Sequence, residues 1–106
     1  EDLMPCSILL HYLSFREYGG FSVDEPVDYV LIHSGIEQSI VDQWRRFGIK
    51  TVAKDHVSLK LWDPFQAGSL FKLHAVGLTE YSRVLVIDND MYIASSLRNA
   101  FLADYD

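Results

Sequence analysis

The chain has 106 residues, with 15 acidic and nine basic side chains and a formal net charge of −6 at pH 7. Hydrophobic residues make up 49% of it and aromatic residues 13%, which predicts a folded domain and not a disordered segment. The acidic balance and the lack of a basic stripe argue against a general nucleic-acid binder. The single cysteine, Cys6, excludes an intrachain disulfide framework. No apolar run approaches the roughly 20 residues that cross a bilayer.

The first predicted element is a helix over residues 6–18. Pro5 precedes it and Gly19-Gly20 follows it, which is typical of helix boundaries. The apolar face predicted from helical spacing contains Cys6, Leu9, Leu10 and Leu13, widened by Ile8, Tyr12 and Phe15. A strand over residues 7–13 is the competing prediction, because this part of the run is short and strongly apolar.

A strand, a helix and a second strand are predicted next. Residues 28–33 contain a continuous apolar core, which indicates a strand. Ser34 and Glu37 have the spacing of a capping box, which predicts the start of a helix that ends at Gly48. Residues 49–53 are predicted to form the second strand. This alternation of strands and helices predicts an α/β fold.

The second half of the chain is predicted to continue this alternation. Residues 57–62 favour no single element. The remaining expected elements are a helix over residues 66–78, a strand over 83–88, a short edge segment over 91–94 and a brief helix over 97–102. Because no repeat, low-complexity segment or Gly/Ser linker divides the sequence, we interpret residues 1–106 as a single domain.

Two carboxylates follow the most apolar segment of the chain. Residues 84–87 read Val-Leu-Val-Ile and run directly into Asp88-Asn89-Asp90. An aliphatic run of this kind is typical of a strand that is buried on both faces in a mostly parallel sheet. Ligands in such sheets bind at the carboxyl ends of the strands. Two carboxylates there are costly unless a cation neutralises them, and a hard divalent cation that carries substrate phosphate is the usual candidate. The pair therefore predicts phosphate-linked chemistry.

Three neighbouring segments make this motif more specific. They are Phe71-Lys72-Leu73-His74, Gly77-Leu78-Thr79-Glu80-Tyr81-Ser82-Arg83-Val84 and Ile87-Asp88-Asn89-Asp90-Met91. Together they resemble glycosyltransferase family 8, the glycogenin-like retaining transferases. In that family a lysine-bearing helix and a Leu-Thr-x-Tyr turn lead into a strand that ends at an Asp-x-Asp motif. The resemblance covers residues 69–102 and extends more loosely back through the strand at 28–33 and its helix.

This resemblance implies a GT-A fold, which is a Rossmann-like domain with a mostly parallel sheet flanked by helices. It also implies a UDP-sugar donor and an Mn²⁺ (or Mg²⁺) ion that bridges the diphosphate. Asp88 and Asp90 would be the metal ligands, and Asp88 would also lie near the donor ribose. Asn89 matches the variable middle position, whose backbone contacts the nucleotide. Lys72 matches the lysine that approaches the donor sugar and phosphates. Carboxylate oxygens suit such an ion, which screens the diphosphate charge and stabilises UDP as a leaving group.

Two parts of the family pattern have no counterpart in this sequence. The family's first strand, whose loop holds the uracil, would precede the helix at 6–18, and residues 1–4 are too short to supply it. The downstream segments with the third metal ligand, usually a histidine, and the acceptor site are also missing. We therefore expect a partial GT-A domain without its first strand, and no transferase activity from residues 1–106 alone. The donor sugar, the glycan or protein acceptor and the compartment, cytoplasm or Golgi lumen, stay open.

Two other functions compete with this interpretation. Haloacid-dehalogenase-like phosphotransferases also place Asp-x-Asp after an aliphatic strand, and there Asp88 would be the nucleophile and Asp90 a general acid/base beside Mg²⁺. Met91 and Tyr92 depart from the usual pattern of those enzymes. The third interpretation is a non-enzymatic interaction module, which would fold without binding nucleotide. The histidines His11, His33 and His56 are predicted to be structural or exposed, since they show no ligand spacing with one another. His74 matches a residue that is frequent in the family motif, and it is predicted to be a packed or surface histidine and not a ligand.

Overall fold

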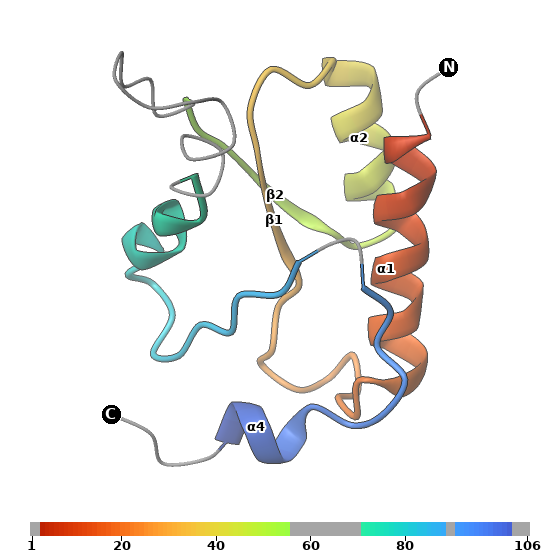
Figure 1. The fold of residues 1–106 in the computed structure, drawn as a ribbon, viewed down its shortest axis with the longest axis vertical. Coiled ribbons are helices and arrows are strands. Elements are labelled where there is room, and N and C mark those ends of the chain that lie inside the picture. The colour runs from red at the N-terminus through yellow and green to blue at the C-terminus, as the bar shows by residue number, and fades with distance from the viewer. Residues whose placement is uncertain (1–2, 56–70, 89–90, 103–106) are drawn as a thin grey trace. The chain divides into compact units, whose positions relative to one another are not determined.

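The computed structural model describes residues 3–55, 71–88 and 91–102. In chain order its elements are helix α1 (Met4–Tyr18), strand β1 (Val30–His33), helix α2 (Gln38–Arg46), strand β2 (Lys50–Ala53), the 3₁₀ helix η1 (Phe71–Gly77) and helix α4 (Arg98–Leu102) (Figure 1). They form two compact units. We call Val30–Val86 the strand unit, and Glu1–Tyr29 with Ile87–Asp106 the α1 unit. The chain is thus a small mixed α/β protein, as the sequence predicts.

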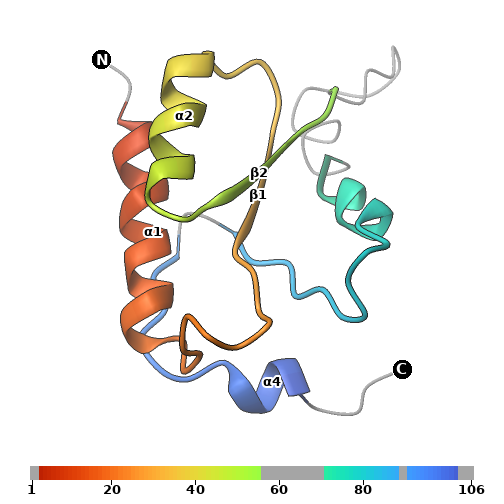
Figure 2. The same ribbon diagram turned by 180° about the vertical axis from the view of Figure 1, so that it is seen from behind.

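The strand unit is built on one parallel strand pair. β1 and β2 run side by side in the register Val30↔Lys50 to His33↔Ala53. A parallel pair needs a crossover connection, and α2 supplies it, so the predicted strands at 28–33 and 49–53 and the helix between them are confirmed. In both views α2 and η1 lie to opposite sides of the strands (Figures 1 and 2). This crossover places the carboxyl ends of both strands at the same edge.

The end of α2 agrees with the sequence, whereas its start does not. Gly48 follows the helix with φ +103°, a left-handed conformation that favours glycine and stops the helix. The predicted capping box of Ser34 and Glu37 is wrong, because Glu37 itself precedes the first helical residue and its side chain makes no capping bond. Gly35 has φ +68° and turns the chain before the helix begins. The helix therefore starts three residues later than a box opening on Ser34 requires.

Helix α1 is confirmed, and its predicted apolar face is correct only in part, because Ile8, Tyr12 and Phe15 are buried whereas Leu10 and Leu13 are not. Proline lies in the first turn as expected, and the competing strand at 7–13 is excluded. The buried residues are Ile8, His11, Tyr12 and Phe15. Leu10 and Leu13 are about half exposed, and Cys6 is an exposed free thiol. Because apolar residues occur on several sides of this helix, hydrophobic spacing predicted a face that is wider than the side that packs.

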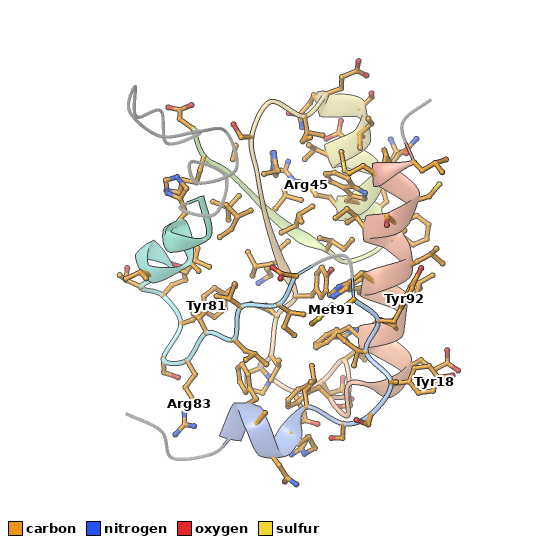
Figure 3. All side chains as sticks on the ribbon, viewed as in Figure 1. Tyr18, Arg45, Tyr81, Arg83, Met91 and Tyr92 are labelled. Atoms are coloured by element: carbon orange, nitrogen blue, oxygen red, sulfur yellow. The ribbon has the colours of Figure 1, made fainter. Side chains whose placement is uncertain are left out.

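Aromatic packing holds the α1 unit together. Phe15, Phe21 and Ile93 form its core cluster. Around them pack the partly buried side chains of Val27, Tyr29, Ile87, Leu97 and Phe101. The amide of Ile93 donates to Ser14 Oγ at 3.1 Å, which ties the segment after the acid motif to α1. Residues 91–94 therefore follow α1 without forming the predicted edge strand, and the exposed side chains of Met91 and Tyr92 are labelled in Figure 3.

A single arginine joins α4 to the loop after α1. Arg98 Nη1 lies 2.7 Å from Glu25 Oε2 and also donates to the Gly20 carbonyl at 3.1 Å. The guanidinium carbon sits 5.3 Å from the centroid of the Phe21 ring. Arg98 therefore combines charge, hydrogen bonding and ring contact at one position. The short helix predicted at 97–102 is confirmed as α4.

The predicted buried strand at residues 83–88 is wrong. These residues belong to no strand, and Val84, Leu85 and Val86 are 45%, 42% and 53% exposed. A central strand needs hydrogen-bonding partners at its edges, and the sheet of the described residues contains β1 and β2 alone. The apolar run at residues 84–87 indicates a tendency towards burial, but it does not determine which strand would pair with these residues.

The helix predicted at 66–78 is confirmed only in part. Residues 71–77 form the tighter 3₁₀ helix η1, in which each turn holds fewer residues than in an α-helix. Residues 66–70 and the undecided segment at 57–62 lie outside the described residues. The Leu78 amide donates to the Ala75 carbonyl at 3.2 Å, and the chain then leaves the helix.

Truncating Ile49 should destabilise the protein far more than truncating its neighbour Phe47. Ile49 is 2% exposed and Phe47 is 54% exposed, although both lie in the connection from α2 to β2. We expect Ile49→Ala to lower the free energy of unfolding by about 2–5 kcal/mol, and Phe47→Ala to change it by less than about 0.5 kcal/mol. Urea unfolding of both variants measures the difference. Equal losses would show that this connection is not packed as described.

Candidate functional site

The structure describes the four predicted site residues to different extents. Asp88 is described and exposed, whereas Asn89 and Asp90 lie outside the described residues. Lys72 lies in η1, and its side chain is outside what the structure describes. Lys72 belongs to the strand unit and Asp88 to the α1 unit. Of the four predicted residues, Asp88 is therefore the one whose side chain the structure describes.

Asp88 begins a segment that is anchored on α1. Ile87, directly before it, packs against the cluster of Phe15, Phe21 and Ile93. Ile93, five positions further on, is buried in that cluster and bonds to Ser14. The carboxylate of Asp88 is thus presented to solvent from a backbone that is held on both sides. Carboxylate oxygens are the ligands that hard cations prefer in proteins.

A buried histidine lies beside this segment. His11 of α1 is 3% exposed, and its Nδ1 lies 2.6 Å from the Tyr29 hydroxyl. Burial lowers the pKa of His11, and the backbone of Asp88 acts on the ring in the opposite direction. Burial also raises the pKa of Tyr29 to about 12. His11 could not be assigned a partner from the sequence, because its hydrogen bond to Tyr29 joins residues 18 positions apart.

His74, next to the predicted motif lysine, has a structural contact. Its Nε2 lies 3.0 Å from the backbone carbonyl of Asp55, just after β2. Because a carbonyl oxygen only accepts, Nε2 carries the proton and donates it. This bond ties η1 to the end of β2, in agreement with the structural role predicted for His74.

A pocket of about 350 Å³ opens at the carboxyl ends of β1 and β2. It is lined by His33, Ser34, Gly35, Ile36, Gln38, Ala53, Lys54 and Asp55. The carboxyl edge of parallel strands is where ligands bind in α/β proteins. Lys54 and Asp55 bring opposite charges to this pocket, so side-chain charge alone selects neither an anion nor a cation.

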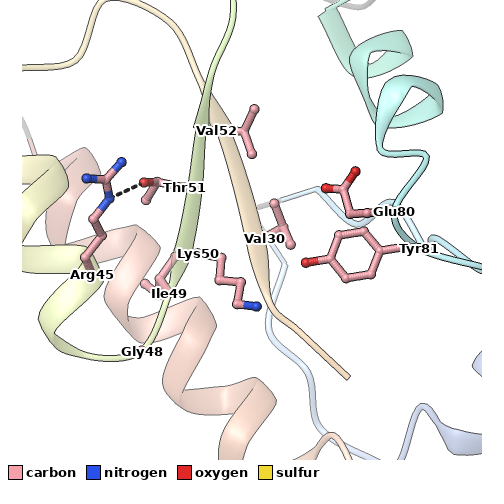
Figure 4. A pocket seen from close by; sticks show the side chains of 9 residues that line it. All are labelled: Val30, Arg45, Gly48, Ile49, Lys50, Thr51, Val52, Glu80 and Tyr81. Carbon is pink, nitrogen blue, oxygen red and sulfur yellow. Dashed lines mark hydrogen bonds between the residues drawn. The ribbon is translucent and has the colours of Figure 1, made fainter. Parts of the chain in front are cut away.

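A larger pocket of about 560 Å³ lies beside the strands (Figure 4). It is lined by Val30, Arg45, Gly48, Ile49, Lys50, Thr51, Val52, Glu80 and Tyr81. Val30 and Val52 point towards the side on which Glu80 and Tyr81 lie (Figure 4). On the α2 side, Arg45 Nε donates to Thr51 Oγ1 at 2.7 Å. Glu80 and Tyr81 of the Leu-Thr-x-Tyr turn therefore line the same pocket as residues of β1 and β2.

The described residues contain neither a cluster of metal-ligating side chains nor a membrane-spanning helix. Within residues 3–55, 71–88 and 91–102, no three His, Cys, Asp or Glu side chains gather in a way that could hold a metal ion. No helix in this part of the chain is long and apolar enough to cross a membrane.

A scan against models of protein families, a search of curated proteins and a search of solved structures find no match to this chain.

The stability of the protein should fall as the pH drops below neutral. Burial lowers the pKa of both His11 and His33 from 6.5, and for His33 the nearby Arg45 charge adds to the effect. The unfolded chain therefore binds protons more readily than the folded one. The stability contributed by the neutral rings is present above pH 6.5 and is lost as the pH falls through the lowered values of the folded state.

Urea unfolding from about pH 7 to about pH 5 tests this dependence, because carboxylates have their ordinary pKa values below that range. The His11→Gln variant, which removes one titrating ring, should show a shallower loss than the wild type. A free energy of unfolding that rises on acidification would contradict the assignment of neutral buried rings.

Proposed function

We propose that this chain is a nucleotide-sugar-binding segment of a retaining glycosyltransferase with a partial GT-A fold. It would bind a UDP-sugar together with Mn²⁺ or Mg²⁺, and the acceptor would be a glycan or a protein. The observation that carries the proposal is the motif Asp88-Asn89-Asp90, preceded by the Lys72 helix and the Leu-Thr-x-Tyr turn. The parallel β1–α2–β2 unit supports it, because GT-A domains are built from such units.

The residues present fit the ion that this function implies. Asp88 offers an exposed carboxylate on an anchored backbone, and Asp90 supplies a second one two positions later. Hard divalent cations prefer such oxygens and keep the remaining positions for water and phosphate. When bound, the ion would screen the diphosphate charge. The chain's own part would be to supply the two carboxylates as ligands of the ion, and the resemblance assigns the Lys72 ammonium to the donor phosphates.

The exposure of Val84, Leu85 and Val86 favours a second candidate function. A contiguous apolar segment at the surface can mediate association with another protein. Under this alternative the chain is a non-enzymatic interaction module. It would fold and associate while binding no nucleotide, so nucleotide binding separates the two functions.

Replacing both aspartates should abolish Mn²⁺-dependent binding of UDP. The Asp88→Asn/Asp90→Asn double variant keeps the size of both side chains and removes the negative charges that attract the ion. Isothermal titration of UDP in the presence and absence of Mn²⁺ measures the effect. Asp24→Asn is the matched control, because Asp24 is an exposed aspartate of the same α1 unit and should leave binding unchanged.

Equal affinity in the double variant and the wild type would exclude a cation site at the motif. A folded wild type that binds no UDP with Mn²⁺ would overturn the transferase proposal and leave the interaction module. Circular dichroism on the same samples shows that each protein is folded.

Removing the Lys72 ammonium should weaken UDP-sugar binding without unfolding the protein. One charge-assisted contact to phosphate is worth about 1.5–3 kcal/mol, so Lys72→Ala should weaken binding by that amount. Arg46→Ala, which removes an exposed cationic side chain at the end of α2, serves as the control. Titration gives the affinity and thermal unfolding gives the melting temperature. A large drop in melting temperature with unchanged affinity would mean that Lys72 is structural.

A further inference from the structure

The outer edge of β2, which faces away from β1, has no strand beside it in the described part of the chain. The Lys54 amide donates to the His33 carbonyl at 2.9 Å, so this N–H points towards β1. Successive residues of a strand direct their N–H and C=O groups to alternate sides of it. Val52 therefore faces β1 as well, whereas Thr51 and Ala53 turn their backbone groups to the outer edge.

A second backbone hydrogen bond agrees with this alternation. The Ile49 amide, two positions before Thr51, turns away from β1 and donates to the Trp44 carbonyl of α2 at 3.2 Å. The outer edge is thus bonded to α2 at Ile49, and the outward groups of Thr51 and Ala53 come after it. Outward backbone groups at the edge of a sheet are a template for pairing with another extended chain.

The pocket of about 560 Å³ lies along this edge. Five consecutive residues, 48–52, line it. Because successive side chains of a strand point to opposite faces, a pocket that such a run lines follows the edge of the strand and not one face. In Figure 4, Arg45 and Thr51 lie on one side of β2, and Lys50 and Val52 lie on the other. The pocket therefore gives an added strand room for side chains on both faces.

The charge around β2 is basic, although the chain as a whole has a net charge of −6. Residues 45–54 contain no acidic side chain and four basic ones, all exposed, which are Arg45, Arg46, Lys50 and Lys54. Arg45 and Lys50 line the pocket, and Glu80 is the acidic residue in its lining. A basic surface of this kind attracts acidic side chains and repels basic ones.

We propose that the outer edge of β2 binds an acidic, extended peptide of a partner protein as an added strand. The peptide backbone bonds to the outward groups of Thr51 and Ala53, and its carboxylates face Arg45 and Lys50. In this mode of recognition the backbone hydrogen bonds give affinity, and the pockets for side chains give specificity. The inference goes beyond nucleotide-sugar binding and does not depend on it, since the proposed donor site uses other residues.

A blocked hexapeptide of alternating glutamate and valine is the probe for the added strand. On titration, the amide resonances of Thr51 and Ala53 should shift, and these amides should exchange more slowly with solvent. The amides of Val52 and Lys54, which face β1, should keep their exchange rates. The same peptide N-methylated at every residue has no N–H to donate and should not bind. Equal binding of the methylated peptide, or unchanged Thr51 and Ala53 amides at saturation, would overturn the proposal.

Three charge variants test the chemistry of the partner, with circular dichroism to show that each is folded. Lys50→Gln should weaken peptide binding by about two- to fivefold, as expected for a cross-strand pair of opposite charges. Glu80→Gln should strengthen it, because it removes the acidic residue from the pocket lining. Arg83→Gln is the control, since Arg83 is an exposed cation of the same unit that does not line the pocket. Unchanged affinity in both Lys50→Gln and Glu80→Gln would contradict the proposed recognition.

Three comparisons with the wild type exclude other occupants of this edge. A lysine–valine hexapeptide that binds as tightly would refute charge recognition. A single-stranded hexamer of deoxythymidylate that causes the same shifts would replace the peptide with a nucleic acid. Shifts of the Thr51 and Ala53 amides that follow protein concentration alone would replace it with a second copy of this chain. The proposal stands if all three comparisons are negative while the acidic peptide binds.

Discussion

The parallel pairing of β1 with β2 is the constraint on which the strand unit depends. Two strands that run in the same direction cannot be joined by a tight turn, so the chain must cross over, and α2 is that crossover. The pairing brings His33 and Ala53 to one edge, where a pocket opens between the loops that follow the strands. It also gives η1 a fixed neighbour, since His74 bonds to the chain just after β2.

The α1 unit depends on packing and on a few polar contacts, since it contains no strand among its described residues. Phe15, Phe21 and Ile93 bring the first and last parts of the chain together. Arg98 donates to the Gly20 carbonyl, and His11 is hydrogen-bonded to the Tyr29 hydroxyl. The result is that Asp88, at the acid motif, is anchored through backbone and apolar contacts while its carboxylate stays exposed. This arrangement supports the proposed cation site.

The sequence predicted those features that local chemistry encodes. Pro5 and Gly48 marked helix boundaries correctly, because each acts through its own backbone. Features that depend on distant partners were not predictable. Hydrophobicity indicated that residues 84–87 avoid water, but it could not supply a neighbouring strand. The place of His11 on the buried side of α1 was not predicted for the same reason, because its hydrogen-bonding partner Tyr29 lies 18 positions away. The cation site at the acid motif stays a prediction from spacing and composition.

The central claim is that the acid motif binds a divalent cation together with a nucleoside diphosphate. Mn²⁺ is paramagnetic and broadens the amide resonances of residues near it, so an NMR titration with Mn²⁺ and UDP locates the ion directly. If the acid motif binds the ion, the amide resonances of Asp88, Asn89 and Asp90 should broaden most, and their broadening should increase when UDP is added. Broadening centred on Lys54 and Asp55 at the pocket of the strand pair, or none at all in the folded protein, would contradict it.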